Sequence, residues 1–178
     1  MDGREVRTLA DLPPLRDRLL FVGSFPSAAS VKAGHYHQDR AGRIFWRRLI
    51  LAGVLPPATK LDTADDALLG AGHGITDLLK TPADPDAIAT DARLTAGVGP
   101  LWQKIALWRP AAVVFIDQRA ASIAAGRPVS EPWGQLSGVA LAGRPCFLMP
   151  DLGASPADVE QGLNFLRNLA AALPRDRP

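Results

Sequence analysis

The sequence predicts an α/β fold, a three-layer α/β/α sandwich built on a small, mostly parallel central sheet. Three uninterrupted apolar runs, at residues 19–22, 111–116 and 145–149, are typical of strands that are buried on both faces. Between these runs, apolar residues recur at helical spacing, so helices alternate with strands. Buried strands that alternate with helices favour a parallel sheet with helices on both of its faces.

Length and composition bound the class of protein. With 178 residues the chain is long enough for one domain spanning 1–178, in which we expect 1–18 to form an N-terminal arm and 173–178 a frayed tail. Hydrophobic residues make up 47% and charged residues 21%, which indicates a globular chain rather than a disordered one. The net charge of +2 permits nucleic-acid binding without requiring it.

Cellular location is also constrained by the sequence. The single cysteine, Cys146, excludes an internal disulfide and fits a reducing compartment. No apolar run reaches the roughly 18 residues of a membrane span. The charged start of the chain lacks the apolar core of a signal peptide. We therefore expect a cytoplasmic protein with no membrane partner, and we also expect a monomer.

The first strand, Leu19–Val22, leads into a loop at Gly23–Ser27. Gly23 allows a sharp turn and a close approach to the backbone. Pro26 blocks helical geometry at Phe25. An open α/β sheet binds its ligand at loops of this kind, after the carboxyl ends of its strands. An ordinary exit from a strand into a loop explains the same residues equally well.

The next segments carry polar rings and an acid. Residues 28–42 contain glycines and are rich in polar rings, among them His35, Tyr36 and His37. From Ile44 the spacing becomes helical, with arginines on the polar side, and Gly53 ends the helix. A short helix is expected over 64–69, and residues 72–79 form a short strand or a turn that contains Asp77.

The second half of the chain repeats the alternation. Asp117 follows a buried strand and is placed to cap the next helix, and Ser155 and Pro156 are typical of a helix start. The expected elements are, in order, a helix over 87–108 interrupted near 97–100, strand 111–116, helix 119–125, a loop over 126–137, strand 145–149, an exit loop at 150–156, and a helix to about Ala172.

Common catalytic motifs are absent from the sequence. There is no Gly-Lys-Ser/Thr phosphate loop, no nucleophile elbow and no dinucleotide fingerprint. One cysteine and three histidines do not favour a zinc site, so we expect no metal and no cofactor. What remains are the three loops that follow strands, at 23–27, 74–77 and 150–156, which a parallel sheet would bring to one edge.

These loops, in this order, resemble those of the uracil-DNA glycosylase superfamily. Gly23–Ser27 is similar to the Gly-x-Asn-Pro-Gly loop of its mismatch-specific uracil/thymine branch, and to a Gly-Ser-x-Pro-Ser-like loop of its hypoxanthine branch. Gly34-His35-Tyr36 followed by Phe45-Trp46 resembles Gly-His-His/Tyr … Asn-Arg-Phe-Trp. Gly74–Leu79 resembles Gly-Ile-Thr-x-Leu-Val, and Met149–Ala157 resembles the last loop of the family. The resemblance covers residues 19–170 and is closest to the mismatch-specific branch.

The resemblance implies a DNA base-excision repair glycosylase. Such an enzyme flips a deaminated base, uracil or hypoxanthine, out of DNA and hydrolyses its N-glycosidic bond without a cofactor. The asparagine that holds the attacking water in this branch is replaced by Phe25, which cannot hold water. Asp77 is the candidate replacement, because a carboxylate can orient water and stabilise a cationic sugar. A capping role for Asp77 in a following helical turn is the alternative.

Two other acids near these loops are weaker catalytic candidates. Asp151, in the last loop, is the second choice. Asp39 is the third, and a solvated loop acid is the simpler interpretation for it. Either this chain moved its polar catalytic group to such a position, or its chemistry has changed or been lost.

The resemblance also suggests base-binding residues. Phe45 is a candidate stacking platform, although an amphipathic helix would equally bury it in the core. The backbone amides near Gly23 and Ser24 are placed to bind a base carbonyl, and Phe25 either shapes the pocket floor or fills the space of the missing asparagine. Tyr36 or His37 would contact the base edge or a phosphate, unless the loop is simply solvated.

DNA-binding residues are expected in two places. Gly153, Ala154 and Ser155 would form the loop that is pressed into the minor groove, with a phosphate at the start of the following helix. Arginines could supply further phosphate contacts or form a solvated helix face, namely Arg40, Arg43, Arg47 and Arg48. Two other functions stay open: a non-catalytic protein that binds damaged or single-stranded DNA, and an enzyme acting on nucleosides or nucleotides.

Overall fold

A computed structural model describes residues 7–82 and 90–174, and shows the α/β fold that the sequence predicts. Five strands form one sheet in the order β2-β1-β3-β5-β4. The strands β1, β2, β3 and β5 run parallel to one another, and the edge strand β4 is antiparallel to β5. Their bounds are Leu19–Gly23 for β1, Gly74–Asp77 for β2, Ala112–Phe115 for β3, Gly134–Leu141 for β4 and Arg144–Leu148 for β5.

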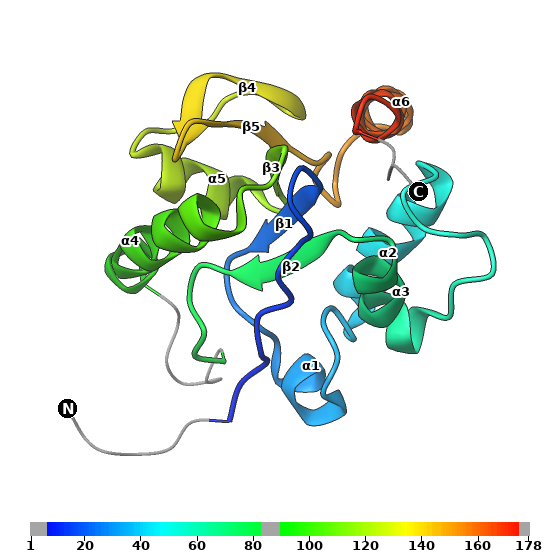
Figure 1. The fold of residues 1–178 in the computed structure, drawn as a ribbon, viewed down its shortest axis with the longest axis horizontal. Coiled ribbons are helices and arrows are strands. Elements are labelled where there is room, and N and C mark those ends of the chain that lie inside the picture. Colours follow the sequence, from blue (N-terminus) through cyan, green and yellow to red (C-terminus); the bar gives the residue numbers. More distant parts are fainter. Residues whose placement is uncertain (1–6, 83–89, 175–178) are drawn as a thin grey trace.

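Helices cover both faces of this sheet, which makes a three-layer sandwich (Figure 1). One face carries α4 and α5, and the other carries α2, α3 and α6. Alternate strand residues supply the two layers of the core, with Phe21 on one side and Val22 on the other. The helices are α1 (Ala28–Ala33), α2 (Arg40–Leu51), a 3-10 turn (Leu61–Thr63), α3 (Ala64–Gly70), α4 (Asp91–Trp108), α5 (Gln118–Ala125) and α6 (Pro156–Ala171).

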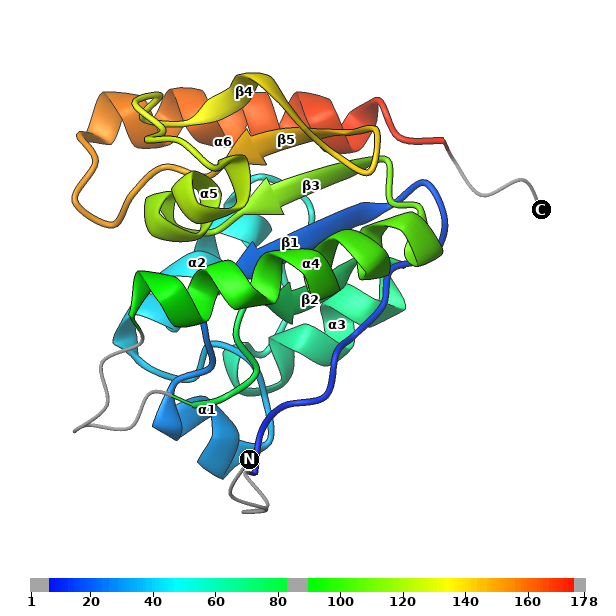
Figure 2. The same cartoon turned by 90° about the vertical axis from the view of Figure 1, so that its left-hand side faces the viewer.

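The carboxyl ends of the parallel strands meet at one edge of the sheet. Gly23 pairs with Asp77, Val22 with Phe115, and Phe115 with Leu148. Figure 2 shows the arrowheads of these strands pointing the same way. The loops after β1, β2, β3 and β5 therefore gather at this edge, here called the carboxyl edge.

Several predicted element boundaries were wrong. The helix predicted from Ile44 begins at Arg40, because the Asp39 carboxylate accepts a hydrogen bond from the Gly42 amide at 2.7 Å and caps it. Asp39 is therefore a cap rather than a solvated loop acid. The start of the segment 28–42, to which the sequence analysis assigned no element, forms α1, and the Ser27 side chain caps this helix.

Helix α4 is continuous where the sequence predicted an interruption. It runs through Gly97–Pro100, and Gly97 lies against the chain after β2, where a Cβ would come within 2.0 Å of the Leu78 carbonyl oxygen. Glycine here permits close packing rather than a break. The predicted residues 87–89, with 1–6 and 175–178 of the expected arm and tail, lie outside the described residues.

Strand β4 falls partly within a segment predicted as a loop. It is an edge strand with two glycines at positive φ, Gly134 and Gly138, and its pairing with β5 shifts register between Gln135 and Ala140. Its burial alternates only at first, so it lacks the apolar run that marks the buried strands.

The segment before β1 covers the outer side of β2. Leu12 and Ile75 exchange backbone hydrogen bonds of 3.0 and 2.8 Å, which forms an antiparallel bridge. The Leu15 amide also donates to the Gly72 carbonyl at 2.8 Å, which ties the same segment to the residues before β2. The described part of the predicted N-terminal arm, residues 7–18, thus shields a sheet edge. No helix within the described residues is long and apolar enough to cross a membrane.

Candidate functional site

Asp77 is the last residue of β2 and lies buried at the carboxyl edge. It is 2% exposed, and its Oδ2 has no hydrogen-bond partner among the described residues. Gly23 faces it so closely that a Cβ there would lie 2.6 Å from Asp77 Oδ1. The next helix that the structure describes begins only at Asp91, so Asp77 does not cap a described helix.

Burial and neighbouring charges control the proton of this carboxyl. Burial raises the pKa of Asp77 to about 7, and the carboxylates of Asp117 and Asp11 also raise it. Lys80 and Lys104 act in the opposite direction. A buried carboxyl with an unsatisfied oxygen and a pKa near neutrality is suited to hold and deprotonate a water molecule.

His37 lies beside Asp77 in a constrained position. Its φ of 54° is in the left-handed region, and its Nε2 is buried without a hydrogen-bond partner in the part of the chain described here. The ring centroid lies 4.8 Å from that of Phe45. Burial lowers the pKa of His37 to about 4, against a raising effect of Asp39, so the ring is neutral at physiological pH.

Two cavities open at the carboxyl edge on either side of His37 and Asp39. The smaller has a volume of about 110 Å³, and Asp77 and Phe25 line it. The larger has a volume of about 230 Å³ and lies between the start of α2 and the loops after β3 and β5. It is smaller than the roughly 300–1,000 Å³ of a drug-sized site. This size suits a small flat group.

Phe45 belongs both to the core and to the larger cavity. It is 4% exposed and packs edge-on against Phe21, with ring centroids 5.7 Å apart. It also lines the larger cavity together with His37 and Met149. The two interpretations of Phe45 are therefore compatible, because one side of the ring packs in the core while the residue still borders the cavity.

The loop after β1 is tied to the loop after β3. The Ser24 amide and hydroxyl donate to the two oxygens of Asp117 at 3.1 and 2.8 Å. Asp117 also caps α5 through the Ala120 amide at 2.7 Å, as the sequence predicts. The Ser24 amide is thus satisfied inside the protein, which argues against the expected contact with a base carbonyl. Phe25 is half-buried against the core layer of α4 and α5.

Tyr36 is buried rather than solvated. It is 3% exposed, and its hydroxyl donates to the Ala10 carbonyl at 2.9 Å and accepts from Lys80 at 2.8 Å. Its amide donates to Asp65 at 3.0 Å. Both polar groups are used within the protein, so Tyr36 supports the neighbouring His37 and is a poor candidate for contact with a base.

Arg48 of α2 binds the backbone of the loop after β5. This buried side chain donates to the carbonyls of Pro150 and Asp151, the latter at 3.0 Å. Arg48 is therefore not available to bind phosphate, contrary to the sequence expectation. Asp151 itself is exposed and borders the larger cavity, while Leu152 is 53% exposed beside it. The sequence analysis did not select Leu152. The available signal was a large apolar side chain in a loop of mostly small and polar residues.

The rest of this loop leads directly into α6. Ser155 caps the helix by accepting from the Asp158 amide at 3.1 Å. Gly153 and Ala154 border a shallow hollow that also reaches Asp151. On α2, the exposed residues Arg40, Arg43 and Arg47 surround another hollow, and Arg43 pairs with Asp62 at 2.7 Å.

Among residues 7–82 and 90–174, one group of possible metal ligands comes together. The donor atoms of His35, Asp65 and Asp66 lie within 4.8 Å of one another. Asp65 already binds His35 Nδ1 at 2.8 Å with one oxygen and the Tyr36 amide with the other. These contacts already use both oxygens of Asp65 and the Nδ1 of His35, and we assign no metal to the group.

Comparison with known protein families places the chain. The family model of the uracil DNA glycosylase superfamily matches residues 10–169, which include all five strands and every loop of the carboxyl edge. A search of curated proteins found no match.

Proposed function

Because the chain belongs to the uracil DNA glycosylase superfamily, we propose that it is a monofunctional DNA N-glycosylase of base-excision repair. Its substrate is DNA that contains a deaminated base, uracil or hypoxanthine, which is flipped out of the stack. The single observation that carries this proposal is the buried Asp77 carboxyl at the carboxyl edge, with one oxygen unsatisfied.

In the proposed reaction the Asp77 carboxylate acts as the general base. It accepts a proton from a water molecule while the water oxygen forms a bond to C1′ of the deoxyribose. The bond between C1′ and the base nitrogen breaks, and its electrons leave with the base. The negative charge of Asp77 also stabilises the cationic character that develops on the sugar. The balance requires only the protein, the DNA and this one water molecule.

The larger cavity is the proposed slot for the flipped base. Extruding a base costs a few kcal/mol, and stacking on an aromatic ring returns about 1–3 kcal/mol. Phe45 and His37 border this cavity and supply such a ring and a polar nitrogen. The amide of Gly23 and the carboxylate of Asp151 stay as secondary candidates for contacts with the base and the sugar.

The loop after β5 is the proposed contact with the DNA duplex. Gly153, Ala154 and Ser155 precede α6, whose N-terminus suits a phosphate. Leu152 offers an exposed apolar side chain of the kind that wedges between bases in the minor groove. Arg40 and Arg43 would neutralise phosphates along α2.

The test is a panel of oligonucleotides that contain uracil, hypoxanthine or xanthine, in single and double strands. We expect an abasic product, detected as strand breakage after alkali, from at least one of them. Asp77→Asn should abolish it, whereas Asp66→Asn, an exposed acid on α3, should leave it unchanged. Absence of product from every substrate at high enzyme excess would refute the proposal.

A second function is favoured by a specific observation. Phe25 stands where the related branch has its water-holding asparagine, and Asp77 is only 2% exposed. A protein with this site would bind damaged or single-stranded DNA without cutting it. A gel shift with intact DNA after alkali would support this function over the glycosylase.

A further inference from the structure

A cluster of three charged side chains lies beside the end of β2. Asp11 forms two ion pairs, one through each carboxylate oxygen. Its Oδ1 lies 2.9 Å from Lys80 Nζ, and its Oδ2 lies 2.8 Å from Lys104 Nζ. The Thr76 hydroxyl donates to Asp11 at 2.5 Å, and Lys104 also reaches Thr76 at 3.2 Å. We call Asp11, Lys80 and Lys104 the Asp11 cluster.

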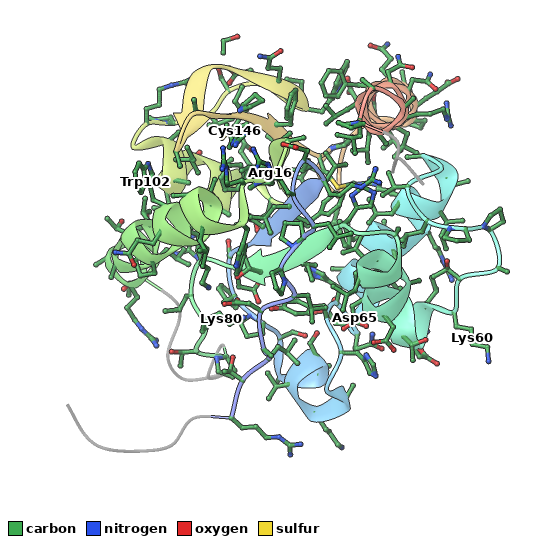
Figure 3. The ribbon with its side chains drawn as sticks, viewed as in Figure 1. Arg16, Lys60, Asp65, Lys80, Trp102 and Cys146 are labelled. Atoms are coloured by element: carbon green, nitrogen blue, oxygen red, sulfur yellow. The ribbon has the colours of Figure 1, made fainter. Side chains whose placement is uncertain are left out.

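The Asp11 cluster joins three distant segments next to Asp77. Asp11 comes from the arm that bridges to β2, Lys104 comes from α4, and Lys80 follows Asp77 by three residues. Lys80 also donates to the Tyr36 hydroxyl at 2.8 Å, and Tyr36 lines the same small cavity as Asp77. In Figure 3, Lys80 lies on the side of β2 and the arm, far from Lys60 on the opposite flank of the molecule.

The cluster carries a net charge of +1, because two lysines face one aspartate. Its three side chains are 22–29% exposed, so solvent screens these charges only in part. The other titratable groups around Asp77 are Asp117 at the cap of α5, and Tyr36, neutral His37 and Asp39 in the smaller cavity. None of these supplies a positive charge, so the lysines are the groups that favour an ionised Asp77.

A purely structural role would not require this composition. The arm is already fixed to β2 by the backbone bridge between Leu12 and Ile75 and by the bond from the Tyr36 hydroxyl to Ala10. One lysine would neutralise Asp11. The second lysine converts a neutral pair into a positive cluster beside the buried carboxyl.

We propose that Asp11, Lys80 and Lys104 are positioning residues whose net positive charge sets how readily Asp77 becomes a carboxylate. The effect of this charge on catalysis rests on the proposed function of Asp77 as the general base. Removing the negative charge with Asp11→Asn raises the cluster to +2 and favours the carboxylate. Removing a positive charge with Lys80→Met or Lys104→Met lowers it to zero and disfavours the carboxylate.

The direct test is the titration of the Asp77 side-chain carboxyl by ¹³C NMR, assigned by its loss in Asp77→Asn. The midpoint should move down in Asp11→Asn and up in Lys80→Met, each by roughly 0.5–1 pH unit, as expected for a nearby charge. Lys60→Met, which removes an exposed lysine far from the site, should leave the midpoint unchanged.

The pH profile of base excision under single-turnover conditions gives a second readout, and its midpoint should shift in the same two directions. If no variant and no wild-type protein excises a base, the proposed function fails while the NMR titration still decides the inference. Thermal unfolding checks that each variant folds, and Lys104→Met replaces Lys80→Met if the latter does not. The inference would be overturned if the Asp77 midpoint in the variants equals that of the wild type. It would also be overturned if the midpoint moves in the same direction in Asp11→Asn and in the lysine variant.

Discussion

Asp77 shows how one side chain couples chemistry to pH. Burial raises its pKa to about 7, so the carboxyl changes its protonation state near neutral pH. A general base must be ionised to accept a proton. We therefore expect the rate of base excision at limiting substrate to rise as the pH increases through about 7 and to level off above it. A rate that falls over this range would argue that Asp77 acts as an acid or not at all.

The same carboxyl predicts a pH dependence of stability. Its pKa is raised from 3.8 in the unfolded chain to about 7 in the folded protein, so its favourable contribution is complete below pH 3.8 and is lost as the pH rises through 7. The side-chain amide of Asp77→Asn does not ionise in this pH range. We expect the free energy of unfolding of this variant, measured in urea, to exceed that of the wild type at about pH 8 and to match it near pH 4.

A matched control separates this effect from the other titrating groups. The exposed Asp66, changed to Asn, is the reference against which the pH dependence of the Asp77→Asn difference is measured. A difference for Asp77→Asn that does not change with pH would mean that the carboxyl is solvated in the folded protein.

At the scale of elements, Arg48 connects α2 to the loop after β5. Arg48→Met keeps the apolar stem but leaves the carbonyls of Pro150 and Asp151 without their donor. We expect a loss of about 1–3 kcal/mol in the free energy of unfolding, the usual cost of an unsatisfied buried group, and weaker binding to DNA. Arg47→Met, on the exposed side of the same helix, should change stability by less than about 0.5 kcal/mol. Equal effects of the two changes would contradict the role of Arg48.

The sequence predicted elements best where local chemistry and burial agree. The runs of β1, β3 and β5 are apolar on both faces, and the caps Asp117 and Ser155 precede their helices directly. The start of α2 had a local signal, the Asp39 cap, which the sequence analysis interpreted as a solvated loop acid. The course of α4 depended instead on packing between distant segments, because Gly97 lies where a Cβ would come within 2.0 Å of the Leu78 carbonyl oxygen. Such contacts have no local signal in the sequence.

The candidate site was predictable in outline for a similar reason. The topology of a parallel sheet brings the loops after its strands to one edge, so Asp77 and the loops around Gly23 and Asp151 were expected to converge. Which polar groups are already satisfied could not be predicted. Ser24 is bound by Asp117, and Arg48 by the loop after β5, and both contacts join segments about a hundred residues apart.

At the scale of the whole molecule, the basic face of α2 predicts a salt-dependent affinity for DNA. Arg40 and Arg43 are exposed beside the carboxyl edge. Changing both to alanine should weaken DNA binding uniformly across sequences and reduce the slope of log K against log salt by about 2, one for each lost phosphate contact. Fluorescence anisotropy over a salt series measures this slope. Arg16→Ala, an exposed arginine that precedes β1 at the opposite end of the strands, should leave it unchanged.

The arm before β1 has two roles that cannot be separated. The bridge between Leu12 and Ile75 closes the outer side of β2, which would otherwise offer free backbone groups to a strand from another molecule. The adjoining residue, Asp11, is held by the two lysines beside the candidate base. Displacing the arm would therefore expose the backbone groups of β2 and remove Asp11 from the two lysines in the same event, so we expect self-association and the proton affinity of Asp77 to change together.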